Sequence, residues 1–140
     1  MTNDWIGFGI QSNITKGMVG ADLFTIDTSK WKLTDQHSDA QNGLPLSDAS
    51  QNYGLWKADL ASNYFISITR SLDTSDSKDL VLEEKSTYYA LWAYGKMQSG
   101  VQQHHSDNRG SVSFVLTENG GNKANSIVIG LGIITLMMIS

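Results

Sequence analysis

Phe65-Ile66-Ser67-Ile68-Thr69-Arg70 alternates apolar and polar side chains along its length. Successive side chains of a strand point to opposite faces, so this stretch predicts a β-strand with one buried face and one solvated face. Similar short runs recur on both sides of it, separated by clusters of Gly, Asn, Asp and Ser, as is typical of an all-β sandwich or barrel. The predicted strands are Trp5–Ile10, Asp22–Ile26, Trp31–Thr34, Leu55–Leu60, Tyr64–Arg70, Leu80–Leu82, Tyr88–Tyr94 and Ser111–Leu116. The predicted strand Tyr88–Tyr94 is aromatic throughout, which favours a strand covered on both faces.

The composition narrows the classes of function. The chain has 140 residues, a formal net charge of −4 and no cysteine, which together suggest one acidic domain without disulfides or Cys-ligated metals. It has no Lys/Arg cluster that could follow a phosphate backbone, so we expect no nucleic-acid partner. It also lacks a Gly-x-Ser-x-Gly elbow and a cysteine nucleophile, so we expect a binding or electron-transfer module and not an enzyme.

Two polar stretches lie between the predicted strands. Gln36–Asn52 is rich in Ser, Asp, Asn and Gln and predicts a long surface loop, and such loops often carry function. Residues 73–79 form an acidic stretch in which Asp73, Asp76 and Asp79 could supply oxygen ligands to calcium. Because Lys78 interrupts these carboxylates, we favour a solvated turn.

Two distant segments carry side chains that can bind iron. Met18 follows Gly17 and precedes Gly20, and glycine lets a backbone approach a ligand closely. The second segment contains His104 and His105. A thioether and an imidazole form a known axial pair for electron-transfer haem, although ordinary loop positions would explain the same residues. A zinc or copper site with His37 is a weaker reading, because neighbouring residues of a strand face opposite sides.

The end of the sequence differs from the rest. Residues 126–140 are apolar and uncharged, and they follow the small polar stretch 119–125. This pattern predicts a membrane-anchoring tail, either a short anchor helix or a cleaved glycolipid-anchor signal; the alternative is a buried last strand or helix. The start of the chain lacks the features of a signal peptide. Asn13-Ile14-Thr15 is an N-glycosylation sequon, a weak indication of a glycoprotein.

The chain resembles the DOMON domain family, which includes extracellular b-type cytochromes and relatives of dopamine β-monooxygenase. The resemblance lies in five elements that occur in order over residues 5 to 116. They are Trp5-Ile-Gly-Phe-Gly9, Gly17-Met-Val-Gly-Ala-Asp22, Phe65-Ile-Ser-Ile-Thr-Arg-Ser-Leu-Asp-Thr74, Ala90-Leu-Trp-Ala-Tyr-Gly95 and His104-His-Ser-Asp-Asn-Arg-Gly110. Family members usually carry one to three strands before the first element. We therefore expect a sandwich lacking its first strands, or one whose open edge is covered by another chain or domain.

The resemblance implies an immunoglobulin-like antiparallel β-sandwich and, in haem-binding members, haem b held without covalent attachment by a methionine and a histidine. Met18 matches the methionine ligand, and His105 or His104 matches the histidine ligand, with His105 preferred. Asp22 and Arg70 match positions that imply an internal ion pair. We also expect Trp5, Phe8, Val19, Tyr94 and Met97 to line the haem pocket.

We therefore predict a DOMON-like β-sandwich over residues 1–118, a polar linker over 119–125 and an apolar tail over 126–140. The predicted function is one-electron transfer by haem b at a membrane surface, extracellular or at the cell surface, with a redox protein or membrane cytochrome as partner. One alternative is a haem-free module that presents Trp31 and Tyr53, with Trp56 near them, to a sugar or a protein. A second alternative is a structural subunit of a larger membrane-associated assembly.

Overall fold

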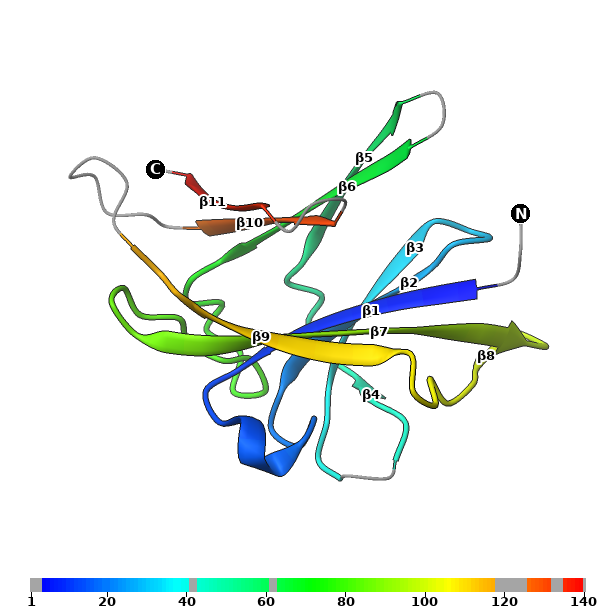
Figure 1. Ribbon diagram of the computed structural model, residues 1–140, viewed down its shortest axis with the longest axis horizontal. Coiled ribbons are helices and arrows are strands. Elements are labelled where there is room, and N and C mark those ends of the chain that lie inside the picture. The colour runs from blue at the N-terminus through cyan, green and yellow to red at the C-terminus, as the bar shows by residue number, and fades with distance from the viewer. Residues whose placement is uncertain (1–3, 41–42, 61–62, 118–125, 132–134, 140) are drawn as a thin grey trace.

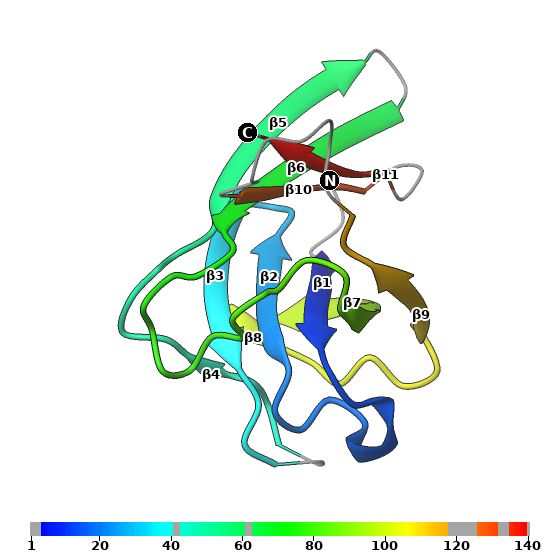
Figure 2. The ribbon, with the colours of Figure 1, turned by 90° about the vertical axis from the view of Figure 1, so that its left-hand side faces the viewer.

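The protein folds into two antiparallel β-sheets that lie face to face (Figure 1). The computed structural model describes residues 4–40, 43–60, 63–117, 126–131 and 135–139, and the side chains of 4–40, 43–55 and 67–117. Figure 2 shows the smaller sheet lying across the strands of the larger one. This arrangement confirms the predicted all-β sandwich.

The larger sheet has seven strands in the order β4-β3-β2-β1-β7, and both β8 and β9 pair with the far side of β7. Strand β1 therefore lies between β2 and β7, with Trp5 opposite Asp27 on one side and Gly95 on the other. The strands are β1 (Asp4–Gln11), β2 (Asp22–Asp27), β3 (Lys32–His37), β4 (Leu46–Ser47), β7 (Thr87–Gln98), β8 (Val101–Gln102) and β9 (Arg109–Val115), and the 3₁₀ turn η1 (Ile14–Lys16) lies between β1 and β2.

The smaller sheet has the order β11-β10-β6-β5. Its strands are β5 (Gly54–Leu60), β6 (Asn63–Ser71), β10 (Ser126–Leu131) and β11 (Thr135–Ile139). The described parts of the apolar tail thus form a hairpin, in which β10 pairs with β6 from Ser126↔Ser71 to Leu131↔Ile66. This is the last-strand alternative for the tail, and a membrane role for it stays a prediction. In the described part of the chain, no helix combines the length and the apolar character needed to cross a membrane.

The core lies between the sheets, because alternate residues of the central strands point inward. Phe8 and Ile10 of β1 and Phe24 and Ile26 of β2 are all at most 2% exposed. They pack with residues from β6, β7 and the connections between strands: Tyr53, Ile68, Leu82, Tyr88, Ala90 and Leu116. The intervening residues of β1, β2 and β7 therefore point to the outer face of the larger sheet.

Three expectations about the strands and loops need correction. Leu80–Leu82 is not a strand: Leu82 is buried, and its N–H donates to the Leu72 carbonyl at 2.8 Å without forming a strand pair. The predicted loop Gln36–Asn52 is largely exposed in its described residues, but β3 extends into it as far as His37, β4 lies within it, and Asp48 is buried. The predicted strand Tyr88–Tyr94 is covered on both faces only at its start, since Tyr94 lies beyond the core and is 51% exposed.

Candidate functional site

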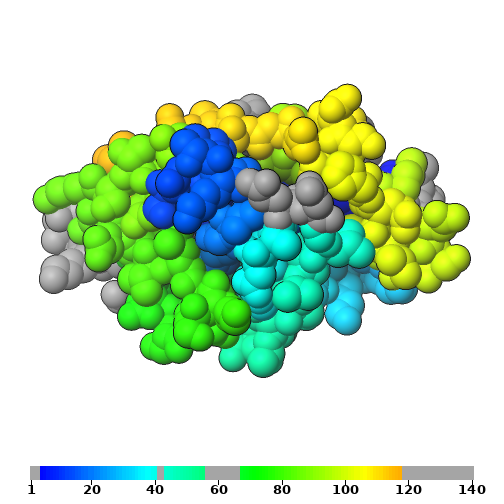
Figure 3. Space-filling model, turned by 90° about the horizontal axis from the view of Figure 1, so that it is seen from below, coloured from blue at the N-terminus to red at the C-terminus, as the bar shows by residue number. Residues whose placement is uncertain are grey.

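A cavity of about 590 Å³ lies on the outer face of the larger sheet. Its floor comes from β1, β2 and β7, and its rim comes from loops at one end of the sheet. Figure 3 shows the segments around η1 (blue), residues 43–47 (cyan) and residues 100–110 (yellow) gathered on one face of the molecule. The lining residues are Trp5, Gly7, Phe8, Gly9, Ile14, Gly17, Met18, Leu23, Phe24, Thr25, Gly43, Leu44, Pro45, Leu91, Trp92, Ala93, Gln102, Gln103, His104, His105, Arg109, Gly110 and Ser111.

Trp5 lies flat on the cavity floor because two glycines leave room for its indole. A Cβ atom added at Gly7 would lie 2.9 Å from Cζ3 of Trp5, and one added at Gly95 would lie 2.8 Å from its Nε1. Real Cβ atoms essentially never come so close, so the Trp-x-Gly pattern of β1 is required by packing. Trp5 is only 3% exposed. The surface that lines the cavity is more apolar than polar.

The same indole fixes the histidine loop. Nε1 of Trp5 donates to the carbonyl of Gln103 at 3.0 Å, and the Gln103 N–H donates to the Lys96 carbonyl at 2.9 Å. The rings of Trp5 and His105 meet edge to face, with centroids 6.4 Å apart. These contacts hold the loop between β8 and β9 against β1, a central strand of the larger sheet.

The two histidines differ in their hydrogen bonds. Nδ1 of His105 donates to the Ser106 carbonyl at 2.8 Å, because a carbonyl can only accept. Nδ1 of His104 instead accepts from the Ser106 N–H at 3.0 Å. In a neutral imidazole only one nitrogen carries the proton. His105 therefore keeps the lone pair of Nε2 for a metal, whereas in His104 the proton is on Nε2. His104 is also the more exposed of the two.

Met18 reaches the cavity from the loop between β1 and β2. Asn13 caps η1 by accepting from the Thr15 N–H at 3.0 Å, and Gly17 and Gly20 adopt φ values of 60° and 75°. Only glycine adopts such values without strain. The Gly20 N–H then donates to the Ser38 carbonyl at 2.7 Å, which ties the loop to the end of β3. Met18 is partly buried and lines the cavity.

The structure brings together most of the predicted haem-site residues. Met18, His104, His105 and Trp5 line the cavity, although they come from separate segments of the sequence. Phe8 borders it as well, but its side chain packs in the core against Phe24.

Three predicted pocket residues, Val19, Tyr94 and Met97, do not line this cavity. Tyr94 is one position out of phase with Ala93 and Gly95, so it points away from the cavity face. Met97 is in phase but lies nearer the end of β7, where it lines a second, smaller pocket of about 250 Å³.

The sequence reasoning missed several residues that line the cavity. Arg109 carries the only permanent charge among the described lining residues, and Leu23 and Leu91 contribute apolar walls. The alternation of side chains along β2 and β7 is a sequence signal that places the two leucines on the outer face of the sheet. Arg109 stood within the quoted His104–Gly110 motif, but nothing in the pattern indicated which way it points.

Two other candidate sites are not supported. Tyr53 is buried in the core and 7% exposed, and Trp31 packs against the core, so neither is displayed for sugar stacking; the side chain of Trp56 lies outside the described residues. His37 uses Nδ1 to bind Asp48 and has Nε2 3.4 Å from Asp39. It is therefore engaged away from the cavity, which leaves a shared zinc or copper site with His104 and His105 without support.

The inner face of the sandwich contains a buried polar cluster. The expected ion pair between Asp22 and Arg70 is confirmed, and both side chains are fully buried. Asp22 also accepts from the Tyr53 hydroxyl at 2.6 Å and from the Leu80 N–H at 2.9 Å. Burial raises the pKa of the Asp22 carboxyl, although Arg70 opposes the shift.

The fold and the cavity define an all-β module with a preformed ligand site on one sheet face. A family model, the DOMON domain, matches residues 1–95. The chain belongs to the DOMON domain family, whose members include haem-binding and other binding or electron-transfer modules. The match includes Met18 and ends before His104. Neither curated proteins nor solved structures gave a match.

Proposed function

We propose that this DOMON domain binds haem b without covalent attachment and transfers single electrons, with Met18 and His105 as axial ligands. The observation that carries the proposal is that one cavity is lined by both a thioether and an imidazole whose Nε2 lone pair is free for a metal. This donor pair is typical of electron-transfer haem.

The residues present fit such a group. A cavity of about 590 Å³ is within the range of roughly 300–1,000 Å³ that small-molecule and cofactor sites occupy. Its walls are largely apolar, and Arg109 supplies one cation suited to a carboxylate on the ligand. Haem would supply the one-electron couple, and the protein would supply ligation, orientation and a low-dielectric surrounding.

Each ligand is held by contacts that the structure describes. The hydrogen bond from His105 Nδ1 to the Ser106 carbonyl orients the imidazole and increases its basicity, as partners of metal-bound histidines generally do. Trp5 supports this loop through Gln103. If Met18 and His105 both bound the haem iron, the site would favour electron transfer over oxygen activation. The net charge of −4 would favour a basic redox partner, and attachment to a membrane through residues 126–140 belongs to the same proposal.

An absorption spectrum of the 140-residue chain with haem supplied, before and after dithionite, tests the proposal. We expect a Soret band and, after reduction, sharp resolved α and β bands. His105→Ala should abolish stable haem binding, because the metal-ready imidazole is lost. His104→Ala is the matched control and should keep the spectrum. Met18→Ala should keep haem but remove the six-coordinate spectrum.

A folded chain without a Soret band would reject this function, and equal behaviour of the two histidine variants would reject the choice of His105. The rival is a haem-free module that binds a sugar in the same cavity. Glycan binding by the folded, haem-free chain would support that rival.

A further inference from the structure

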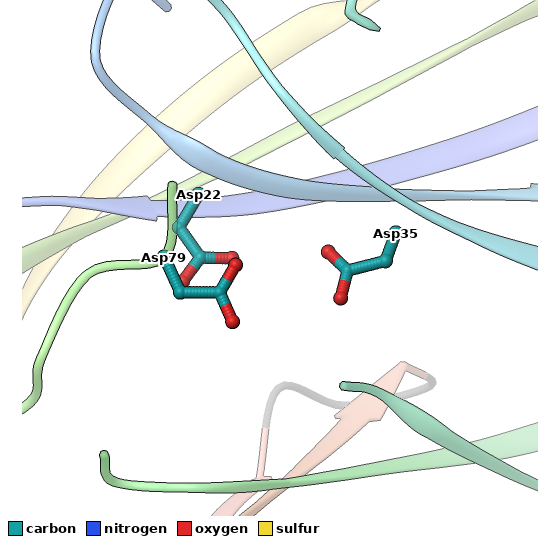
Figure 4. A group of neighbouring side chains, drawn as sticks. All are labelled: Asp22, Asp35 and Asp79. Atoms are coloured by element: carbon teal, nitrogen blue, oxygen red, sulfur yellow. The ribbon is translucent and has the colours of Figure 1, made fainter. Parts of the chain in front are cut away.

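Three carboxylates meet between the two sheets, on the side of the larger sheet opposite the cavity. Asp22 begins β2, Asp35 lies in β3, and Asp79 lies in the connection between β6 and β7. One carboxylate oxygen of each lies within 4.8 Å of the others. Figure 4 shows the carboxylate of Asp35 directed toward those of Asp22 and Asp79. The expectation that Asp79 belongs to a solvated turn is therefore wrong.

Two oxygens of this cluster have no hydrogen-bond partner among the described residues. Asp35 is 0% exposed; its Oδ2 accepts from the Asn52 N–H at 2.7 Å, but its Oδ1 is buried and unpartnered. Oδ2 of Asp79 accepts from Thr74 Oγ1 at 2.6 Å and from Asn52 Nδ2 at 3.1 Å, whereas its Oδ1 is likewise buried and unpartnered. Buried polar atoms in native proteins nearly always have a partner, so these two oxygens point to a missing positive group.

The charges of the cluster lead to the same conclusion. Asp22, Asp35 and Asp79 bring three negative charges when ionised, and Arg70 brings one positive charge to Asp22. The nearby Asp48 has its own partner in His37. Two negative charges are thus uncompensated in the interior, which is costly without a counter-charge. A bound dication would supply the missing two charges.

We propose that Asp22, Asp35 and Asp79 form a calcium site that joins β2, β3 and the β6–β7 connection. Carboxylates are hard oxygen ligands and select hard cations. Oxygens lie 2.3–2.6 Å from Ca²⁺, so two on opposite sides of the ion are roughly 4.6–5.2 Å apart, whereas around Mg²⁺ they are roughly 4.0–4.2 Å apart. The three oxygens lie within 4.8 Å of one another, so they can all reach one ion of the size of Ca²⁺.

The site would be structural. Its three ligands come from segments that are distant in sequence, and it lies on the inner face, away from the cavity that contains Met18 and His105. Calcium binding and haem binding are consequently separate proposals, and either can fail without the other.

Calcium titration of the chelator-treated 140-residue chain, followed by calorimetry and by thermal unfolding, tests the site. We expect one Ca²⁺ bound per chain, a rise of the unfolding midpoint by at least about 4 °C at saturation, and a smaller response to Mg²⁺. Asp35→Asn should lose the response to calcium. Asp48→Asn, which also changes a buried aspartate, is the matched control and should keep it.

The wild-type measurement decides the question even if a variant fails to fold. An unchanged midpoint and no bound Ca²⁺ in the wild-type chain would overturn the site and indicate a carboxylic acid that shares a proton with its neighbours. A response to Mg²⁺ as large as that to Ca²⁺ would overturn the choice of calcium. A calcium response that survives Asp35→Asn would overturn the assignment of Asp35.

Discussion

The two faces of the central strands β1 and β2 differ in what they contact. The inner face packs Phe8, Phe24 and a buried charge cluster against the smaller sheet, and its side chains are almost fully enclosed. On the outer face, Gly7 and Gly95 leave room for the ring of Trp5, and Trp5 and Leu23, although buried, line the floor of a cavity. One strand thus contributes to both the core and the ligand site, because its successive side chains point to opposite faces of the sheet. Changes on the inner face should affect stability, and changes on the outer face should affect ligand binding.

The largest expected effect is that of Arg70→Met. It would remove the partner of Asp22 in an ion pair whose two side chains are fully buried. Leaving one buried charge unpaired typically costs about 3–5 kcal/mol, which is enough to unfold many small domains. The free energy of unfolding in urea measures the loss.

The matched change on the surface is Lys96→Met, which removes the partner of Asp4 in an exposed pair with 2.5 Å between Nζ and Oδ1. Exposed pairs contribute about 0–1 kcal/mol, so its effect should be small. Similar losses in the two variants would contradict the distinction between a buried and an exposed ion pair.

The second effect is a pH dependence in the presence of a chelator. Burial raises the pKa values of Asp22, Asp35 and Asp48, in the case of Asp35 to about 7. Between pH 4 and 7 the native state therefore keeps protons that the unfolded chain has released, and stability should fall as the pH rises, by at most about 1.4 kcal/mol per pH unit for each proton. Urea midpoints at pH 5, 6 and 7 measure the slope.

Two comparisons sharpen this result. Asp35→Asn should flatten the slope, because the group with the largest raised pKa no longer titrates. The pKa of Asp27 is lowered, chiefly by its hydrogen bond from Ser29, so Asp27 titrates below this range and does not oppose the trend. Stability that rises between pH 5 and 7 would contradict the description of the inner cluster.

A smaller effect on stability than that of Arg70→Met is expected for Trp5→Phe, on the outer face of the larger sheet. The change keeps an aromatic ring on the cavity floor but removes the hydrogen bond from Nε1 to the Gln103 carbonyl. The stability lost should be about 1 kcal/mol, while haem affinity should fall because the His105 loop loses its support. Equilibrium titration with haem measures the affinity. Trp92→Phe is a control for stability, since its Nε1 makes no hydrogen bond among the described residues and the chain should lose less.

The sequence predicted the strands with alternating side chains well, because their pattern is local. Trp5–Ile10 and Tyr64–Arg70 correspond to β1 and β6 within two residues at each end. Leu80–Leu82 is apolar for a different reason, since Leu82 fills the core from a connection between strands. Periodicity cannot separate these two cases when a run has only three residues.

The residue types of the candidate site could be predicted from the sequence, but the directions in which its side chains point could not. The side chains of Met18, His104 and His105 and their positions in the DOMON motifs both indicate iron ligands, and the fold places all three at one cavity. The preference for His105 now has a physical reason in the opposite hydrogen bonds of the two Nδ1 atoms. The cluster of Asp22, Asp35 and Asp79 could not be predicted from the sequence, because the three residues are far apart in the chain and Asp79 lies among other acidic residues.

The central position of β1 also affects how the chain can fold. Strands β1, β2 and β3 follow one another in the chain and can pair as soon as they are synthesised. The other edge of β1 can pair only after β7 has been synthesised, since Asp4 and its partner Lys96 are 92 positions apart. At about 5–20 residues per second during synthesis, the edge that later supports Trp5 stays open for several seconds. Such an unpaired edge is a template for intermolecular pairing, and non-local pairing is slow. Expression yield should therefore depend on how quickly β7 closes the sheet.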